Sequence, residues 1–399
     1  MDTTKHKTKQ SNVSAANNIS GAVTFFVAVM LALALSLFCV IALGEDAPFA
    51  INDDNNPAPI SDDDSVPDGD DDEAPDAYVG RYAYNTLSED DKSVYKKLDE
   101  EISRMGSVSG LVYMGDIADL NHIIKCVYYD KPEYFWFGGG CSSSYISNPD
   151  GSKTVDIWFD YIISETERDE ALPVITEAGS KLVDTLSGKS DFDKAKGVYD
   201  YLTDTIVYDM DYMKGNTLYF VMNFGRGVCG GYARAAQYLF NLQGIECMTV
   251  SSADHAWNIV KLDGEYYQFD ATWGDQKEYI DYSYLNFDDK TARMLDSHEI
   301  IDDITWPECS AQKDNYFVHE GLVFDALDKD KLSYAVGKAN GAGVFAMSFS
   351  SPEAYSDACK WLNGNREVYD VLADAGYSNK TYRFSCSDKT RSITVLIDI

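Results

Sequence analysis

The stretch Gly225-Arg226-Gly227-Val228-Cys229-Gly230-Gly231-Tyr232-Ala233 places a cysteine where a glycine-rich turn gives way to a helical pattern. Apolar residues recur downstream at the spacing of one helix face, and Gly244 is the kind of residue that ends a helix. The stretch therefore predicts a helix whose first residue is Cys229. The apolar positions of this helix are Ala233, Ala236, Leu239 and Phe240.

Two later stretches carry a histidine and an aspartate on what is predicted to be one β-hairpin. Asp254-His255-Ala256-Trp257-Asn258 opens the first alternating run, and Phe269-Asp270-Ala271-Thr272-Trp273 closes the second. The dipeptide Asp263-Gly264 separates the runs 255–262 and 265–272, which is a strong hairpin signal. A two-residue turn sets position 255 opposite position 272, so Asp270 becomes the diagonal neighbour of His255 on the same face. We expect this carboxylate to reach the imidazole.

The three side chains are those that thiol catalysis needs. A cysteine attacks as the thiolate, but a free thiol, with a pKa of about 8.5, is mostly protonated at neutral pH. The positive end of a helix and an adjacent imidazolium both lower that pKa. Cys229 is therefore the predicted nucleophile, His255 the general acid and base, and Asp270 the orienting carboxylate. Each residue alone has an ordinary structural explanation, but their order on a helix start and a hairpin favours the triad.

The surroundings of the cysteine suggest how a substrate would be held. Gly227, Gly230 and Gly231 are expected to leave room for a substrate backbone beside the sulfur. The backbone N–H of Cys229 is the natural first donor to an oxyanion. Asn223 and Tyr219 are both candidates for the second donor.

These motifs resemble those of the bacterial transglutaminase-like superfamily, which shares the papain-like fold. Gly-Val-Cys-Gly-Gly-Tyr-Ala, His-Ala-Trp-Asn and Phe-Asp-Ala-Thr-Trp carry the resemblance. It covers roughly residues 190–310 and includes Tyr208-Asp209 and Tyr284-Leu285-Asn286 with His298, which we interpret as a structural histidine behind the hairpin. A weaker match lies at Asp130-Lys131-Pro132-Glu133.

The resemblance implies an α+β fold, in which a helix with the nucleophile at its N-terminus packs on an antiparallel sheet, flanked by small α/β units. It also implies the same roles for Cys229, His255 and Asp270. It does not fix the reaction, because the superfamily includes transglutaminases, proteases, amidases and inactive members. Gly230 departs from the pattern, since many relatives carry a polar residue such as Gln there. The resemblance does not extend to the calcium dependence of the large animal enzymes, and we expect no cofactor and no metal.

The composition limits the choice of partners. The chain has 399 residues, a net charge of −33 and 45% hydrophobic residues. The length allows two or three domains. Such acidity argues against nucleic acid, which requires basic patches.

The N-terminal region predicts a membrane anchor. Residues 21–43 are almost entirely apolar, which is long enough to span a bilayer as a helix. Three lysines precede them and the next basic residue is Arg81, so the tail 1–20 is expected in the cytoplasm and everything after residue 44 outside. A cleaved signal peptide ending at Ala42-Leu43-Gly44 is the alternative, and would make the protein secreted. Residues 44–78 are expected to be a disordered acidic linker, because residues 45–76 contain 13 Asp or Glu and no Lys or Arg.

Three folded units are predicted after the linker: an N-terminal α/β unit at 79–165, a catalytic domain at 166–310 and a small C-terminal α/β unit at 311–399. In the first unit, strands are expected at Glu133–Phe137 and Thr154–Ile163, joined by a Gly/Ser-rich loop around Gly138–Ser152. In the last, strands are expected at 322–327, 344–349, 382–386 and 393–397, with a helix at Pro352–Leu362. The six remaining cysteines outside the apolar segment show no C-x-x-C spacing, so zinc and redox roles are not expected, while disulfides are possible in an oxidising compartment. They are Cys126, Cys141, Cys247, Cys309, Cys359 and Cys386.

The sequence thus favours a membrane-anchored extracytoplasmic thiol enzyme that acts on amide or peptide bonds of a protein or peptide substrate, with cell-wall peptides among the candidates. Whether water or an amine resolves the thioester is left open. One alternative is a catalytically silent binding or scaffold module at the cell surface. A weaker one is an adhesin or sensor whose acidic linker binds calcium.

Overall fold

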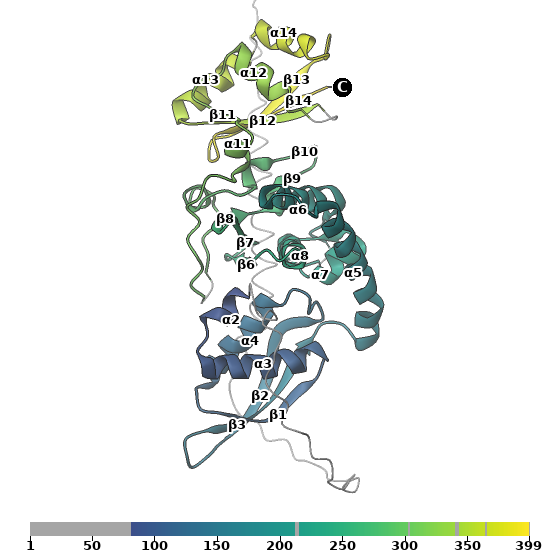
Figure 1. Cartoon of the computed structure of the whole chain (residues 1–399), viewed down its shortest axis with the longest axis vertical. Helices are drawn as coiled ribbons and strands as arrows, with labels where there is room; N and C mark the ends of the chain where they lie inside the picture. Colours follow the sequence, from purple (N-terminus) through teal and green to yellow (C-terminus); the bar gives the residue numbers. More distant parts are fainter. Residues whose placement is uncertain (1–80, 212–214, 302–303, 340–342, 364, 399) are drawn as a thin grey trace, which may run out of the picture. The chain divides into compact units, whose positions relative to one another are not determined.

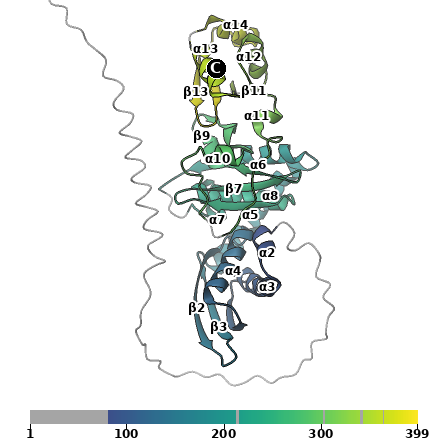
Figure 2. The same ribbon diagram turned by 90° about the vertical axis from the view of Figure 1, so that its left-hand side faces the viewer.

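The computed structural model describes residues 81–398, apart from 212–214, 302–303, 340–342 and 364 (Figures 1 and 2). Among these residues, no helix is both long enough and apolar enough to cross a membrane. The predicted tail, membrane segment and linker, residues 1–78, lie outside the described part of the chain.

The first region combines three helices with a three-stranded antiparallel sheet. Serine and aspartate caps start the two longer helices, where Ser88 accepts a hydrogen bond from the N–H of Asp91, and Asp116 with Asp119 forms a capping box. The strand order is β1-β3-β2. The elements are α2 (Tyr82–Thr86), α3 (Glu89–Ser103), β1 (Ser107–Tyr113), α4 (Ile117–Asp130), β2 (Phe137–Ser147) and β3 (Lys153–Tyr161).

Two expectations for this region were wrong. The strand predicted at Glu133–Phe137 starts only at Phe137, and the predicted Gly/Ser-rich loop is mostly strand β2. Gly138–Gly140 form a bulge in this strand, with Gly139 at φ +83°, and the serines that follow face solvent. Strand β1 was not predicted at all.

The central region contains the predicted nucleophile helix and hairpin. Helix α8 packs against the antiparallel sheet β6-β7-β8, with α6 beside it (Figure 1). Its elements are α5 (Glu165–Leu186), α6 (Asp191–Thr205), β4 (Val207–Tyr208), α7 (Leu218–Phe224), β5 (Arg226–Gly227), α8 (Cys229–Leu242), β6 (Cys247–Ser251), β7 (Ala256–Leu262), β8 (Glu265–Phe269), α9 (Ala271–Gly274), β9 (Asp275–Gln276), β10 (Tyr279–Ile280), η1 (Tyr282–Tyr284) and α10 (Asp289–Ala292).

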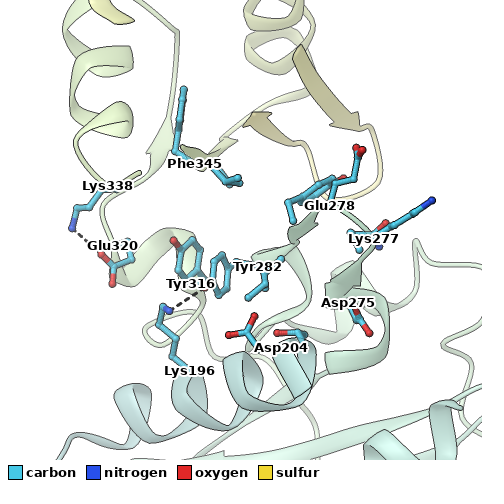
Figure 3. A pocket seen from close by; sticks show the side chains of 16 residues that line it. Lys196, Asp204, Asp275, Lys277, Glu278, Tyr282, Tyr316, Glu320, Lys338 and Phe345 are labelled. Carbon is cyan, nitrogen blue, oxygen red and sulfur yellow. Dashed lines mark hydrogen bonds and ion pairs between the residues drawn. The ribbon is translucent and has the colours of Figure 1, made fainter. Parts of the chain in front are cut away.

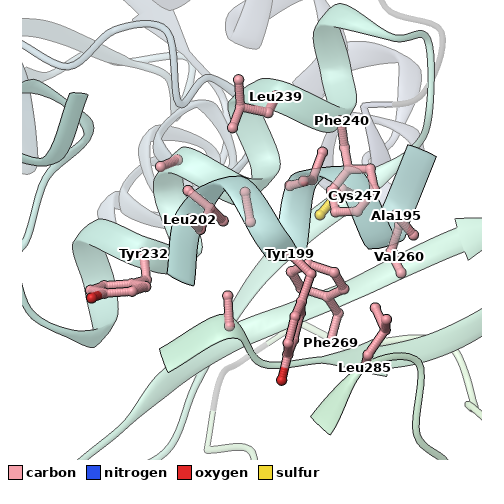
Figure 4. Close-up of a cluster of buried hydrophobic side chains, with 14 of the residues drawn as sticks. Ala195, Tyr199, Leu202, Tyr232, Leu239, Phe240, Cys247, Val260, Phe269 and Leu285 are labelled. Atoms are coloured by element: carbon pink, nitrogen blue, oxygen red, sulfur yellow. The ribbon is translucent and has the colours of Figure 1, made fainter. Parts of the chain in front are cut away.

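Large aromatic side chains fix α6 and α8 on the sheet (Figure 4). The ring of Phe269, at the end of β8, lies 5.3 Å from Tyr199 of α6 and 5.1 Å from Phe240 of α8, edge to face in both cases. All three side chains are fully buried. Burial of each contributes about 1.5–3 kcal/mol, so the helix start and the hairpin ends are held on a rigid core.

Buried polar bonds also join α8 to the end of α4. The guanidinium of Arg234 donates to the carbonyl of Tyr128 at 2.5 Å and lies over its ring. The amide of Gln237 donates to the carbonyl of Tyr129 at 2.7 Å. These acceptors are last-turn carbonyls of α4, which have no partner inside their own helix. The boundaries predicted between the three folded units remain a prediction.

The C-terminal region is a four-stranded sheet, in the order β11-β12-β14-β13, with helices packed on it. The predicted helix Pro352–Leu362 is confirmed, as is the strand at 344–349, whereas the strand predicted at 322–327 shrinks to two residues. The elements are α11 (Tyr316–His319), β11 (Val323–Phe324), α12 (Lys329–Val336), β12 (Val344–Phe349), α13 (Pro352–Leu362), α14 (Arg366–Asp374), β13 (Tyr382–Ser387) and β14 (Ser392–Ile397).

Candidate active site

Cys229 is the first residue of α8, as predicted. Val228 occupies the N-cap position and caps no N–H group with its side chain. The positive end of the helix dipole therefore lies at the cysteine. Gly244 has φ +71° just after the helix, which confirms the expected C-terminal turn.

The glycines around Cys229 make room for the chain itself, and not for a substrate backbone as expected. A Cβ atom at Gly231 would lie 2.3 Å from the carbonyl oxygen of Gly215, and one at Gly227 would lie 2.7 Å from the same oxygen. A Cβ at Gly230 would lie 1.8 Å from Oδ1 of Asn216. The N–H of Val228 also donates to the carbonyl of Gly215 at 3.0 Å. The segment 215–216 is thus packed along the helix start.

The hairpin has the predicted register. Leu262 pairs with Glu265 and Asn258 with Phe269, which is the alignment that a two-residue turn at Asp263-Gly264 requires. The second strand is shorter than expected, because β8 ends at Phe269 and the short helix α9 replaces residues 271–272 of the predicted strand. Asp270 is the N-cap of α9, and not a strand residue.

The structure brings the histidine and the aspartate together. His255 Nε2 lies 2.7 Å from Oδ2 of Asp270, and the Cys229 thiol is near enough to the imidazole to help raise its pKa. The other carboxylate oxygen, Oδ1, accepts the backbone N–H of Trp273 at 3.0 Å. Both His255 and Asp270 are buried, so water does not compete for these bonds.

Burial and charge act in opposite directions on this pair. Burial alone would lower the pKa of His255, but the charge and hydrogen bond of Asp270, together with Cys229, raise it to about 10. Burial alone would raise the pKa of Asp270, but His255 and the hydrogen bond from His298 bring it well below its usual range. The histidine therefore favours its protonated form and the aspartate its ionised form, which is the charge pattern that stabilises a neighbouring thiolate.

His298 is the contact that the sequence did not reveal. Its Nε2 atom lies 3.0 Å from Oδ2 of Asp270, the same oxygen that binds His255. The interpretation of His298 as a packing residue behind the hairpin missed this bond, because nothing in the local pattern links positions 270 and 298. The potential ligand atoms of His255, Asp270 and His298 lie within 4.8 Å of one another. Their direct hydrogen bonds account for that spacing.

The two expected oxyanion donors lie in different surroundings. Tyr219 belongs to an aromatic cluster, where its ring stacks on Phe135 at 5.8 Å. Asn223 is half-buried in α7. Asn216, which was not predicted, is the side chain that lies against Gly230 in the first turn of α8.

The other cysteines divide into single thiols and one close pair. Cys126, Cys247 and Cys309 are buried, and burial raises the pKa of Cys247 and Cys309. The sulfur atoms of Cys359 in α13 and Cys386 in β13 lie 3.0 Å apart.

A separate cavity of about 480 Å³ lies among α6, β10, η1, α11 and β12 (Figure 3). Its lining includes Lys196, which is 2.6 Å from Asp200, and Lys338, which is 2.8 Å from Glu320. None of the three predicted triad residues lines it. Two of its three lysines are paired with carboxylates, and no cysteine or histidine lines it, so we assign no chemistry to this cavity.

With the fold and the site described, known proteins can be compared. The family model of the transglutaminase-like superfamily matches residues 180–271. This part of the chain is thus similar to transglutaminase-like domains, and the α+β fold class predicted from the motifs is confirmed. The match supports a thiol enzyme in general.

Individual relatives are distant. Human kyphoscoliosis peptidase is 24% identical over 169 residues, which are 35% of this chain and 25% of that protein. This chain thus spans a quarter of the length of that curated relative. Three solved structures match with low TM-scores. They are a TGase (19% identity, 35% of this chain and 46% of that one, TM-score 0.26), a candidate cysteine protease from Cytophaga hutchinsonii (12%, 33% and 62%, 0.22) and a candidate protease from Parabacteroides distasonis (13%, 33% and 36%, 0.20).

Proposed function

We propose that the chain is a thiol enzyme that cleaves amide or peptide bonds through Cys229, His255 and Asp270. The observation that carries the proposal is the hydrogen bond between His255 and Asp270 beside the Cys229 thiol, which starts a helix and acts on the pKa of the imidazole. The transglutaminase-like match over residues 180–271 supports it. A protein or peptide is the substrate class that such a domain implies.

The proposed reaction has two halves. The Cys229 thiolate attacks the amide carbonyl and forms a C–S bond, while the oxyanion is stabilised by the backbone N–H of Cys229. Protonated His255 gives its proton to the amine nitrogen as the C–N bond breaks. The amine leaves and a thioester remains on Cys229.

The second half decides between hydrolysis and transfer. Water or a primary amine, deprotonated by His255, attacks the thioester and restores the thiol. We place Asn216 at the second oxyanion position, because its amide group lies against the helix turn that starts with Cys229. In this chain Asn216 fills the space into which a side chain at position 230 would project.

We further propose that residues 21–43 anchor the protein in the membrane with its folded part outside the cytoplasm. The apolar run and the lysines before it support this orientation. Cell-wall peptides are then among the accessible substrates. Protease treatment of intact cells tests the orientation, because an extracytoplasmic domain is digested and a cytoplasmic one is protected.

Labelling of the full-length chain with iodoacetamide tests the thiol chemistry. At about pH 6 a free cysteine is almost entirely protonated, whereas Cys229 should react quickly as an ion pair with His255. His255→Ala should remove that reactivity, and Cys229→Ala should remove the labelled peptide and all turnover while the protein stays folded. Full turnover by Cys229→Ala would refute the mechanism. An unreactive Cys229 in the folded wild type would instead favour a catalytically silent scaffold.

A peptide mixture with and without a primary amine then distinguishes the two reactions. Carboxylic acid products in both conditions indicate hydrolysis. New amides that form only when the amine is present indicate transfer.

A further inference from the structure

A second histidine shares the carboxylate of the proposed triad. Oδ2 of Asp270 accepts hydrogen bonds from Nε2 of His255 at 2.7 Å and from Nε2 of His298 at 3.0 Å. The other oxygen, Oδ1, accepts a hydrogen bond from the backbone N–H of Trp273 at 3.0 Å. A carboxylate oxygen has two lone pairs, so Oδ2 can accept two donors at once. All three donors reach a carboxylate whose side chain is fully buried.

The environment of His298 indicates which ring nitrogen is the donor. Its Nδ1 atom is buried and has no hydrogen-bond partner among the described residues. Three aromatic rings surround the imidazole, with ring centres 4.5 Å away for Trp257, 4.8 Å for Trp273 and 5.7 Å for Phe287. An N–H on Nδ1 would have no acceptor in these surroundings, which is costly. The Nε2–H tautomer leaves only a lone pair unpaired and still donates to Asp270.

The loop that carries His298 is hydrogen-bonded to two residues at the connection between β6 and β7. Ser297 donates its hydroxyl to Asp254 at 3.3 Å, next to His255 in the chain. The N–H of Ile301 donates to the carbonyl of Ser251 at 3.1 Å. The imidazole of His298 is therefore held in place relative to the hairpin, and not merely packed behind it.

We propose that His298 is a positioning residue that moderates the hold of Asp270 on the His255 proton. Its donated N–H takes up part of the negative charge on Oδ2, so the carboxylate pulls less strongly on the imidazolium. The inference rests on the proposed function, in which His255 must release that proton to the leaving amine. An imidazolium held by an unshared carboxylate would be a weaker acid in that step.

Several other titratable groups face this network. Tyr199 and Tyr284 are buried, whereas Tyr208 is partly exposed, and desolvation together with nearby negative charge raises the pKa of each, for Tyr208 to about 12. They therefore stay neutral while His255 titrates. The groups are Tyr199 from α6, Tyr208 from β4, Cys229 from α8, Asp254 before β7 and Tyr284 from η1.

Two amide substitutions form a matched pair for the test. In His298→Gln the amide nitrogen can reach the position of Nε2 and still donate to Asp270. In His298→Asn the side chain is one bond shorter and the donor falls near the position of Nδ1. A third variant, His298→Leu, removes the donor without adding a polar group. Cooperative thermal melting of each variant shows whether it folds.

The readout is the pKa of His255 in the full-length chain, measured from the Cε1–H signals of 13C-labelled histidine. The His255 signal is assigned with the His255→Gln variant. We expect His298→Asn and His298→Leu to raise the pKa of His255 by about half a unit to one unit, as loss of one hydrogen bond to the shared oxygen implies, and His298→Gln to leave it nearly unchanged. An unchanged pKa in a folded Asn or Leu variant would overturn the inference, as would an equal shift in Gln and Asn.

The pH profile of Cys229 alkylation by iodoacetamide, read from the mass of the Cys229 peptide, separates this inference from the proposed function. If the wild-type thiol titrates like a free cysteine, the proposed thiol mechanism fails, while the histidine signals still decide the role of His298. If the wild type shows an ion pair and the variants do not shift His255, only the inference about His298 fails.

Discussion

Alanine substitution should destabilise the protein more at Gly231 than at the adjacent Gly230. This is expected although the contact of an added Cβ atom is shorter at Gly230. A Cβ atom at Gly230 would meet Oδ1 of Asn216 at 1.8 Å, the closer contact. A Cβ at Gly231 would meet the backbone oxygen of Gly215 at 2.3 Å and Cγ2 of Val221 at 2.4 Å. Asn216 is exposed and ends in a rotatable amide, whereas the Gly215 carbonyl is fixed by its bond to the N–H of Val228. The first contact can be relieved by rotation and the second cannot.

The expected magnitudes follow from these contacts. In Gly231→Ala, the Gly215 carbonyl and the Val221 side chain each have to move away from the new methyl group by roughly 1 Å, and such overpacking costs about 1–3 kcal/mol. Loss of the Val228–Gly215 hydrogen bond adds about 1 kcal/mol, and the better helix propensity of alanine returns about 0.5–1 kcal/mol. Gly231→Ala should therefore lose about 2 kcal/mol of stability. Gly230→Ala should be within about 0.5 kcal/mol of the wild type, because the gain in propensity offsets the displacement of an exposed side chain.

Urea unfolding of both variants, followed by tryptophan fluorescence, measures the difference. The same preparations can be compared for turnover, where Gly230→Ala should lose activity if the displaced Asn216 is the second oxyanion donor. Equal destabilisation by the two variants, or a larger loss in Gly230→Ala, would show that the segment 215–216 is not held against the helix start as described.

Three further outcomes are expected. Asn216→Ala should lower turnover about 100-fold, as removal of an oxyanion donor does, with little change in melting temperature. Because the pKa of His255 is raised to about 10, protonated His255 should stabilise the folded state fully below about pH 6.5, the ordinary pKa of a histidine. This contribution to the free energy of unfolding should be lost as the pH rises towards 10. Urea unfolding at a series of pH values should show the loss in the wild type and not in the His255→Gln variant. Cys359 and Cys386, with sulfurs 3.0 Å apart, should form a disulfide when an oxidised small-molecule disulfide accepts their two electrons and two protons. The mass of the intact protein should then fall by that of two hydrogens, and the Cys386→Ser substitution should prevent this change. If the two cysteines stay reduced under those conditions, the close placement of their sulfur atoms is wrong.

Local signals in the sequence predicted the helix start and the hairpin well. Asp263-Gly264 fixes the turn, and the turn fixes the register of every pair from 258 to 269, so His255 and Asp270 could be brought together without coordinates. The end of β8 was missed because Asp270, a proposed triad residue, is also an N-cap, and capping depends on the chain turning away at Ala271.

Contacts between distant segments could not be predicted in this way. His298 reaches Asp270 across 28 residues, and no periodicity links them. The glycines beside Cys229 are explained by a neighbouring segment, 215–216, whose position depends on tertiary packing. Strand β2 was hidden because Gly and Ser disfavour strands in isolation, while a bulge and a solvent-facing edge accommodate both here.

The bonds from Arg234 and Gln237 to the end of α4 limit how far this protein can be shortened. A truncated form that begins at residue 166 would retain the nucleophile, the hairpin and His298. It would also retain a buried guanidinium and a buried amide whose acceptors, the carbonyls of Tyr128 and Tyr129, had been removed. The smallest stably folded version of the protein therefore has to include the first sheet and its helices, even though no proposed catalytic group comes from them. Helix α8, which carries the proposed nucleophile, also caps the C-terminal end of α4, so the central region is not independent of the first region.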